Sequence, residues 1–159
     1  MGESFFIQQS FLSKSECDAY IEKAYKNVGV GRDIPWEKRV LKLENYDPII
    51  DKVINFFGNF NLSFRIADAS ITTWNVGAIS DPHVHGLGNK GYDDKRQNTK
   101  YNSIIYLNDD FEGGEFYTDN IIIKPKMGTL TLFDGSEIFH GIKEIKKKER
   151  YIIILWWLK

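Results

Sequence analysis

Apolar and polar residues alternate in short runs from about residue 62 to the C-terminal end of the chain. A period of two is typical of β-strands, because successive side chains of a strand point to opposite faces of the sheet. Glycine, asparagine, aspartate and proline residues separate these runs and indicate turns. The pattern predicts short strands at 63–76, 101–108, 114–119, 121–125, 128–134, 138–145 and 150–158.

The run RYIIILWWL at 150–158 is apolar in both sets of alternating positions. A strand of this kind is apolar on both of its faces, and such strands are buried on both sides. We therefore expect other parts of the chain to cover each face of this strand.

The residues before 62 follow a different pattern, after a possible short strand at 4–8. Apolar positions recur every three or four residues in 13–27 and 46–58, which predicts two amphipathic helices. Ser13 and Glu16 have the spacing of a capping box, while Asp47 and Pro48 suit a helix N-cap and the first helical position. The apolar stripes consist of Cys17, Tyr20, Ile21, Ala24 and Tyr25, and of Ile49, Ile50, Val53, Ile54 and Phe57.

Helices followed by many short strands, one of them covered on both faces, favour a mainly β (α+β) fold. The expected architecture is a β-sandwich or jelly roll with two or so N-terminal helices packed on one sheet. The 159 residues contain no repeat or linker, so we expect one domain over 1–159. Its helical support would occupy about 13–58 and its barrel about 62–159.

The composition narrows the class of protein. Hydrophobic residues make up 42% and charged residues 27%, as in ordinary soluble globular domains. The formal net charge of -1 argues against a nucleic-acid partner. The N-terminal residues lack the pattern of a signal peptide, and the longest apolar run is too short to span a bilayer as a helix. We therefore expect a cytoplasmic protein without a membrane partner; the single cysteine, Cys17, fits a reducing compartment.

The chain has three histidines, and His83 and His85 share the stretch DPHVHG. Side chains two residues apart in an extended segment point to the same side, so both imidazoles can converge on one point. His140 lies in the predicted strand at 138–145, which a jelly roll can bring beside the first segment. An isolated His-x-His pattern is more often structural than metal-binding, so the surrounding sequence has to decide.

Several motifs around the histidines follow one another in order. Trp74, Gly77 and His83 have the spacing of an aromatic-x-x-G-x(5)-H-x-D signature, and YLNDDFEGGEFY, KPKMGTLTLF, His140 and RYIIILWW come after it. From about Ala69 to the C-terminal end, this series resembles the prolyl-4-hydroxylase-type branch of the iron(II)- and 2-oxoglutarate-dependent dioxygenases. The resemblance implies a double-stranded β-helix (jelly roll), and SFLSKSECDAYI resembles the helix that opens many members.

The resemblance implies that His83 and His140 are two iron(II) ligands, a role that neutral imidazoles suit. His85 stands where the family has a carboxylate ligand, and we predict that His83, His85 and His140 together bind the metal. Two alternatives remain open. Asp81 could supply a carboxylate from the same face as His83, or His85 does not bind and the site is impaired.

The resemblance also implies a 2-oxoglutarate site. Arg150 begins the last predicted strand, where the family places the basic residue that pairs with the distal carboxylate, and a guanidinium can do so with two hydrogen bonds. Tyr106 matches a tyrosine that bonds the same carboxylate, and Asn102 and Ile104 would share its inward face. Trp74 stands where many members have a tyrosine, and its indole can donate a hydrogen bond but not accept one.

The implied activity is hydroxylation of an unactivated C–H bond with iron(II), 2-oxoglutarate and dioxygen, and no catalytic residue beyond the metal ligands is predicted. By analogy with the nearest branch, the expected substrate is a prolyl residue of a peptide or protein. The polar stretch 86–100 is expected to be a flap that selects substrates. The alternatives are a three-histidine dioxygenase that does not use 2-oxoglutarate, which would leave Arg150 and Tyr106 without a role, and a jelly-roll binding module without catalysis.

Overall fold

The structure is a computed structural model of the chain, and it describes residues 5–27, 32–34, 38–85 and 96–158. These residues form two helices, α1 (Lys14–Lys26) and α2 (Pro48–Gly58), and strands that pair only in antiparallel fashion. The larger sheet has the order β1 (Phe5–Gln8), β10 (Leu130–Asp134), β6 (Tyr101–Tyr106), β13 (Arg150–Leu158), β4 (Arg65–Trp74), β3 (Lys38–Lys42) and β2 (Arg32–Ile34). The smaller sheet has the order β5 (Ser80–His83), β11 (His140–Ile142), β8 (Phe116–Thr118) and β9 (Ile122–Ile123), and β12 (Ile145–Lys147) pairs with β7 (Glu112–Gly113).

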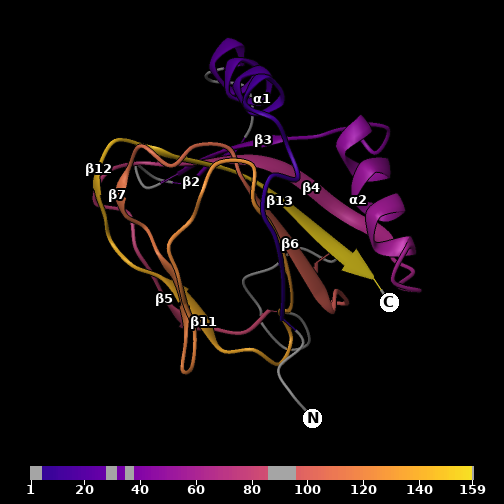
Figure 1. Ribbon diagram of the computed structural model, residues 1–159. Helices are drawn as coiled ribbons and strands as arrows, with labels where there is room; N and C mark the ends of the chain where they lie inside the picture. The colour runs from indigo at the N-terminus through magenta and orange to yellow at the C-terminus, as the bar shows by residue number, and fades with distance from the viewer. Residues whose placement is uncertain (1–4, 28–31, 35–37, 86–95, 159) are drawn as a thin grey trace.

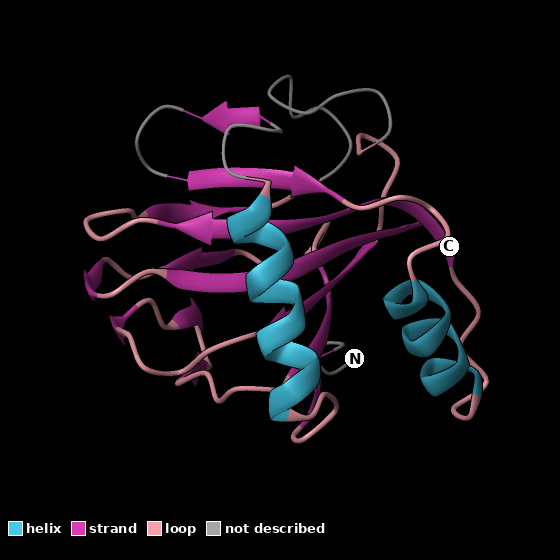
Figure 2. Ribbon diagram, turned by 90° about the horizontal axis from the view of Figure 1, so that it is seen from above, coloured by secondary structure: helices cyan, strands magenta, loops and turns pink. Residues whose placement is uncertain are grey.

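The two main sheets form two layers. Figure 1 shows β5 and β11 of the smaller sheet across from β4, β13 and β6 of the larger one, with both helices on the far side of the larger sheet. The view from above in Figure 2 places α1 and α2 on the same face of that sheet. The predicted mainly β jelly roll with two N-terminal helices on one sheet is confirmed.

Both helices begin directly after the N-cap residues that were predicted for them, Ser13 and Asp47. The Ser13 side chain accepts a hydrogen bond from the Glu16 N–H, and the Glu16 carboxylate accepts one from the Ser13 N–H. Asp47 caps α2 by accepting from the Ile49 N–H at 3.1 Å. These caps satisfy backbone donors that have no partner inside the helix. Tyr25 departs from the predicted stripe, since 57% of its surface is exposed at the end of α1.

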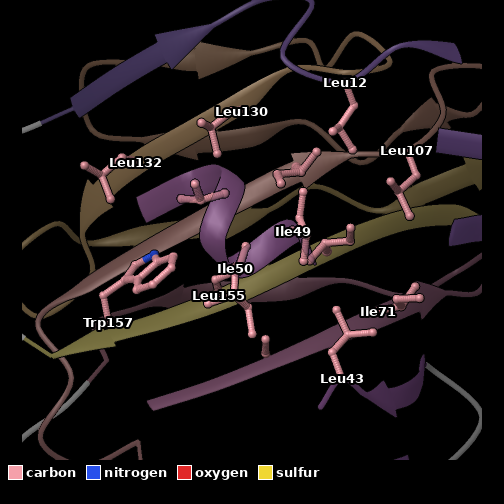
Figure 3. Packing of buried hydrophobic residues seen from close by; sticks show 14 of the residues in the cluster. Leu12, Leu43, Ile49, Ile50, Ile71, Leu107, Leu130, Leu132, Leu155 and Trp157 are labelled. Carbon is pink, nitrogen blue, oxygen red and sulfur yellow. The ribbon is translucent and has the colours of Figure 1, made fainter. Parts of the chain in front are cut away.

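Two hydrophobic clusters fill the space on either side of the larger sheet. The outer cluster packs the two helices on the sheet, and Figure 3 shows Ile49 and Ile50 of α2 against members from the strands. The inner cluster lies between the sheets and includes Ile104, Tyr106 and Ile152. In β13, Ile153, Leu155 and Trp157 belong to the outer cluster, while Ile152 and Ile154 belong to the inner one. The expected burial of this strand on both faces is therefore confirmed.

The sequence pattern missed β2, β3 and β7, and it merged β11 with the first residue of β12. β3 has the sequence KRVLK, in which charged residues interrupt the apolar alternation, and it forms by pairing with β4 from Lys38 to Lys42. Such strands depend on their neighbour more than on their own propensity. None of the helices in the described ranges has the length and apolar character required to cross a bilayer.

Candidate metal centre

The smaller sheet brings the three histidines together. His83 at the end of β5 lies directly opposite His140 at the start of β11. His85 follows β5, and its backbone N–H donates to the Gly135 carbonyl oxygen at 2.6 Å. The His85 Nε2 atom lies 3.0 Å from His83 Nε2 and 3.2 Å from His140 Nε2. One ring nitrogen from each histidine thus lies within 4.8 Å of the others.

The opposite nitrogen of each ring faces an oxygen atom. His83 Nδ1 lies 2.8 Å from the Asp81 carbonyl oxygen, and His140 Nδ1 lies 2.8 Å from that of Ile138. His85 Nδ1 lies 2.7 Å from Asn102 Oδ1. A carbonyl oxygen only accepts, so each Nδ1 carries the proton and each Nε2 presents a lone pair to the other two rings. Three lone pairs that face one another form a site for a cation, and bound histidines usually donate their other N–H in this way.

Burial keeps the imidazoles of His85 and His140 neutral. Burial, helped by the proximity of His140, lowers the pKa of His85 to about 3. Burial also lowers the pKa of His140 to about 4. A histidine must be neutral at the coordinating nitrogen to bind a metal, so both rings are ready to do so near neutral pH.

Asp81 does not join this cluster. Its side chain is exposed, and it faces His83 through its backbone carbonyl oxygen. Among the described residues, the group able to hold a metal consists of His83, His85 and His140. A donor set of three imidazoles suits iron, zinc, copper or nickel and contributes no negative charge.

Arg150 and Tyr106 form a second polar site, which is buried on the inner face of the larger sheet. Arg150 is fully buried, and its guanidinium carbon lies 5.3 Å from the Tyr106 ring centre and 5.6 Å from that of Trp74. Within the described residues, neither the Arg150 nitrogens nor the Tyr106 hydroxyl has a hydrogen-bond partner. Burial lowers the pKa of Arg150 and raises the pKa of Tyr106. A buried cation without a partner is costly, so this place fits an anion with oxygen acceptors.

Strand β6 runs from the histidine cluster to the Arg150 site. Asn102, beside His85, and Tyr106, beside Arg150, lie on the same face of β6, with the buried Ile104 between them. Four residues of a strand span about 13 Å. The histidine cluster and the buried guanidinium therefore lie near the two ends of one stretch of the inner face of β6.

Sequence reasoning missed several residues that surround the histidines. The Trp156 ring lies 4.5 Å from that of His85, and the Phe116 ring stacks on His140 at 5.3 Å. Gly135 approaches His85 closely. The alternation along β13 carried a signal for Trp156, because it places Trp156 and Arg150 on the same face.

The predicted flap at 86–100 falls mostly on residues 86–95, which lie outside the described residues. Its described end is anchored beside the histidines. The Arg96 Nε atom donates to Asp68 at 2.7 Å, and the Arg96 guanidinium lies 4.9 Å from the Trp156 ring that packs on His85.

Comparison with known proteins gives matches to a family and to two groups of relatives. The profile of the 2OG-Fe(II) oxygenase superfamily matches residues 71–158. Prolyl 3-hydroxylase 2 of Homo sapiens is 42% identical over 65 residues, which covers 36% of this chain and 9% of that protein. Prolyl 3-hydroxylase 1 of Gallus gallus is also 42% identical over 65 residues, with the same coverage. The match therefore spans only about a tenth of these curated relatives.

Solved structures resemble the whole fold. The viral collagen prolyl hydroxylase of Paramecium Bursaria Chlorella virus-1, in complex with 2OG, has a TM-score of 0.76 at 22% identity, covering 98% of this chain and 96% of that one. A Pseudomonas putida prolyl-4-hydroxylase has a TM-score of 0.73 at 14% identity, covering 99% and 93%. HygX of Streptomyces hygroscopicus, with nickel and 2-oxoglutarate bound, has a TM-score of 0.69 at 9% identity, covering 98% and 82%. At these identities the likeness shows a shared fold.

Proposed function

Since the chain belongs to the 2OG-Fe(II) oxygenase superfamily, we propose that it is an iron(II)- and 2-oxoglutarate-dependent hydroxylase of an unactivated C–H bond. We further propose a prolyl residue of a peptide or protein as its substrate. The observation that carries the proposal is that three converging imidazoles and a buried Arg150 face the same space between the two sheets, and that the Arg150 nitrogens have no hydrogen-bond partner among the described residues. A binding module without catalysis would have no use for this combination.

The residues fit the two groups that the family uses. His83, His85 and His140 would hold iron(II) through their Nε2 atoms, with each Nδ1–H held by an oxygen acceptor. When bound, iron(II) supplies the chemistry by which dioxygen oxidises 2-oxoglutarate to succinate and carbon dioxide and hydroxylates the substrate.

The protein's own part is to bind, orient and exclude water. Arg150 would pair with the distal carboxylate of 2-oxoglutarate, and the Tyr106 hydroxyl would donate to the same carboxylate. Trp74 and Ile104 line this region with apolar surface, and both are at least nine-tenths buried. Burial in an apolar environment strengthens each of these polar contacts.

The substrate proposal draws on the relatives and on the surface beside the site. A prolyl hydroxylase of Trichoplax adhaerens, solved with a peptide fragment of the hypoxia inducible factor oxygen degradation domain, shares the fold with a TM-score of 0.69. Here Phe139, directly before His140, is 51% exposed, and so is Ile79 before β5. These exposed apolar side chains flank, in the sequence, the strands that carry His83 and His140, and exposed apolar surface there favours a substrate with an apolar segment, such as a peptide.

The test is an anaerobic iron(II) titration with and without 2-oxoglutarate, followed by visible spectroscopy. We expect a charge-transfer band that saturates at about one iron per chain, and formation of succinate when dioxygen and a proline-containing peptide are added. Mass spectrometry of the peptide then locates the added oxygen atom.

Other results would contradict the proposal. Iron binding without the band would indicate a three-histidine dioxygenase that does not use 2-oxoglutarate. A protein that binds no iron, and whose melting temperature does not respond to a chelator, would be a binding module.

A further inference from the structure

Asn102 is a fully buried amide in the middle of the larger sheet. It lies on β6 between Phe133 of β10 and Trp156 of β13 in the strand register. Its Oδ1 atom faces His85 Nδ1 at 2.7 Å, while its Nδ2 atom has no hydrogen-bond partner among the described residues. A buried amide with one unsatisfied end costs free energy, so its contact with His85 is the gain that the structure shows for it.

Gly135 provides the space for this contact. A Cβ atom at position 135 would lie 2.1 Å from Asn102 Oδ1 and 2.9 Å from His85 Nδ1. Gly135 does not have the positive φ angle found at Gly113, Gly114 and Gly128. The backbone would therefore tolerate a side chain here, and it is the hydrogen bond between Asn102 and His85 that leaves no room for one.

The contact determines which nitrogen of His85 can bind a metal. An acceptor at Nδ1 keeps the proton there and leaves the lone pair on Nε2, toward His83 and His140. The Gly135 carbonyl oxygen fixes the His85 backbone at 2.6 Å, and the Trp156 ring packs on the imidazole at 4.5 Å. A carboxylate at position 85 has no N–H to donate, so it would not need a hydrogen-bond acceptor such as Asn102 Oδ1.

We propose that Asn102 is a positioning residue that makes His85 a metal ligand, with Gly135 as the space that the pair requires. This inference rests on the proposed metal centre and goes beyond it. On this inference, the sheet orients the imidazole at position 85 for metal coordination through a hydrogen bond of its own. The absence of the family's carboxylate at this position is then compatible with a working metal site.

The experiment measures the affinity of the full chain for cobalt(II) and, anaerobically, for iron(II) in three variants. Asn102→Leu keeps the approximate volume but removes the acceptor, and we expect metal binding weaker by about 10- to 100-fold. Asn102→Asp keeps an acceptor and adds charge, so it should bind at least as tightly as the wild type. Gly135→Ala should weaken binding in the same way as Asn102→Leu.

Ser103→Ala is the matched control. Ser103 is the next residue of β6, is also fully buried and accepts a hydrogen bond from the Trp157 indole in the outer cluster. This variant removes a buried polar contact of the same strand on the side away from the histidines. Its metal affinity should equal that of the wild type.

Two further measurements separate positioning from folding. Nitrogen-15 NMR of the metal-free protein should show the Nδ1–H tautomer of His85 in the wild type and in Asn102→Asp, and a mixture of tautomers in Asn102→Leu. In the His85→Ala background, Asn102→Leu should cause no further loss of metal affinity, because the residue through which it acts is absent.

Wild-type affinity in Asn102→Leu would overturn the inference, and so would an equal loss in Asn102→Asp. Either result leaves the proposed function in place if the wild-type protein still forms the charge-transfer band with 2-oxoglutarate. A wild-type protein that binds no metal would overturn both proposals.

Discussion

His85 contributes no negative charge to the metal centre, and neither do His83 and His140. Arg150, on the inner face of the larger sheet, adds a buried positive charge to the same space between the two sheets. With a bound divalent metal, both the metal centre and Arg150 would be positive. The dianionic 2-oxoglutarate would then neutralise both ends at once, so we expect the metal and the co-substrate to strengthen each other's binding.

Replacement of Arg150 by methionine should change binding and stability in opposite directions. Arg150→Met removes a buried charge that has no hydrogen-bond partner among the described residues, so the metal-free protein should be as stable as the wild type or more stable. Binding of 2-oxoglutarate should weaken by roughly 30-fold or more, because the charged hydrogen bonds to the distal carboxylate are lost. Calorimetry with 2-oxoglutarate and urea unfolding measure the two effects. Unchanged affinity for 2-oxoglutarate would show that Arg150 does not bind it.

The assignment of the metal ligands predicts that replacing His83 or His140 weakens iron binding, whereas replacing the neighbouring Asp81 does not. His83→Ala and His140→Ala should each bind iron too weakly for a stoichiometric titration, because two imidazoles hold the metal far more weakly than three. Asp81→Asn should bind iron as the wild type does, since the Asp81 side chain is exposed and only its backbone faces His83. Anaerobic iron titration checks all three variants. Loss of iron in Asp81→Asn would instead make that carboxylate a ligand.

The motifs and the family resemblance that they carry were enough to predict that the three histidines of the chain lie together and that Asn102, Ile104 and Tyr106 share an inward face. They could not show that Asn102 faces His85, because that contact depends on how β6 is placed relative to the segment after β5. Nor could they assign a reason to Gly135, whose backbone angles do not require a glycine. Its importance comes from two side chains that are remote in the sequence.

At the scale of elements, the start of α2 ties the two helices together. Asp47 accepts hydrogen bonds from the Ile49 N–H, from the Tyr20 hydroxyl at 2.6 Å and from the Lys23 ammonium at 3.0 Å. Burial alone would raise the pKa of Asp47, but these hydrogen bonds outweigh it and the pKa lies below its ordinary value. The ionised carboxylate therefore stabilises the folded state.

Asp47→Ala should lower the free energy of unfolding by about 1–2 kcal/mol or more, because it removes the cap and leaves the Tyr20 hydroxyl without its acceptor. Asp47→Asn keeps an acceptor and should cost less. Since the folded pKa is lowered, the contribution of the charge is fully present above about pH 3.9 and is lost as the pH falls through the folded value. Urea unfolding at pH 7 and near pH 3 should show wild type and Asp47→Asn converging in acid. A constant difference would contradict the assigned role of the charge.

The elements with strong patterns of their own could be predicted from the sequence. The capping box at Ser13, the cap at Asp47 and the two apolar faces of β13 are local signals, and the structure has them where they were expected. The sequence of β3 carries no such signal, because β3 is a strand through its pairing with β4. The division of 138–145 into β11 and β12 was also hidden, because the two parts pair with different strands.

For the whole molecule, a metal that binds only the folded chain should raise its stability by mass action. At a free metal concentration of 100 times the dissociation constant, the gain is about 2.7 kcal/mol. For a chain of this size, that corresponds to a rise in melting temperature of about 5–10 °C. Thermal unfolding with cobalt(II), and again after addition of a chelator, measures the shift. His140→Ala should show no shift; an equal shift in this variant would place the bound metal elsewhere.

β13 belongs to both hydrophobic clusters at once, and it lies between β6 and β4 in the larger sheet. The strand that carries Arg150 and Trp156 therefore cannot separate from its neighbours without opening the helical side and the inner side together. Its amides should exchange with solvent deuterium only through global unfolding, whereas those of the short β5 and β11 can open locally. In this architecture the proposed 2-oxoglutarate site lies on the rigid sheet, and the more adaptable sheet, which carries His83 and His140, is where we expect a substrate to be accommodated.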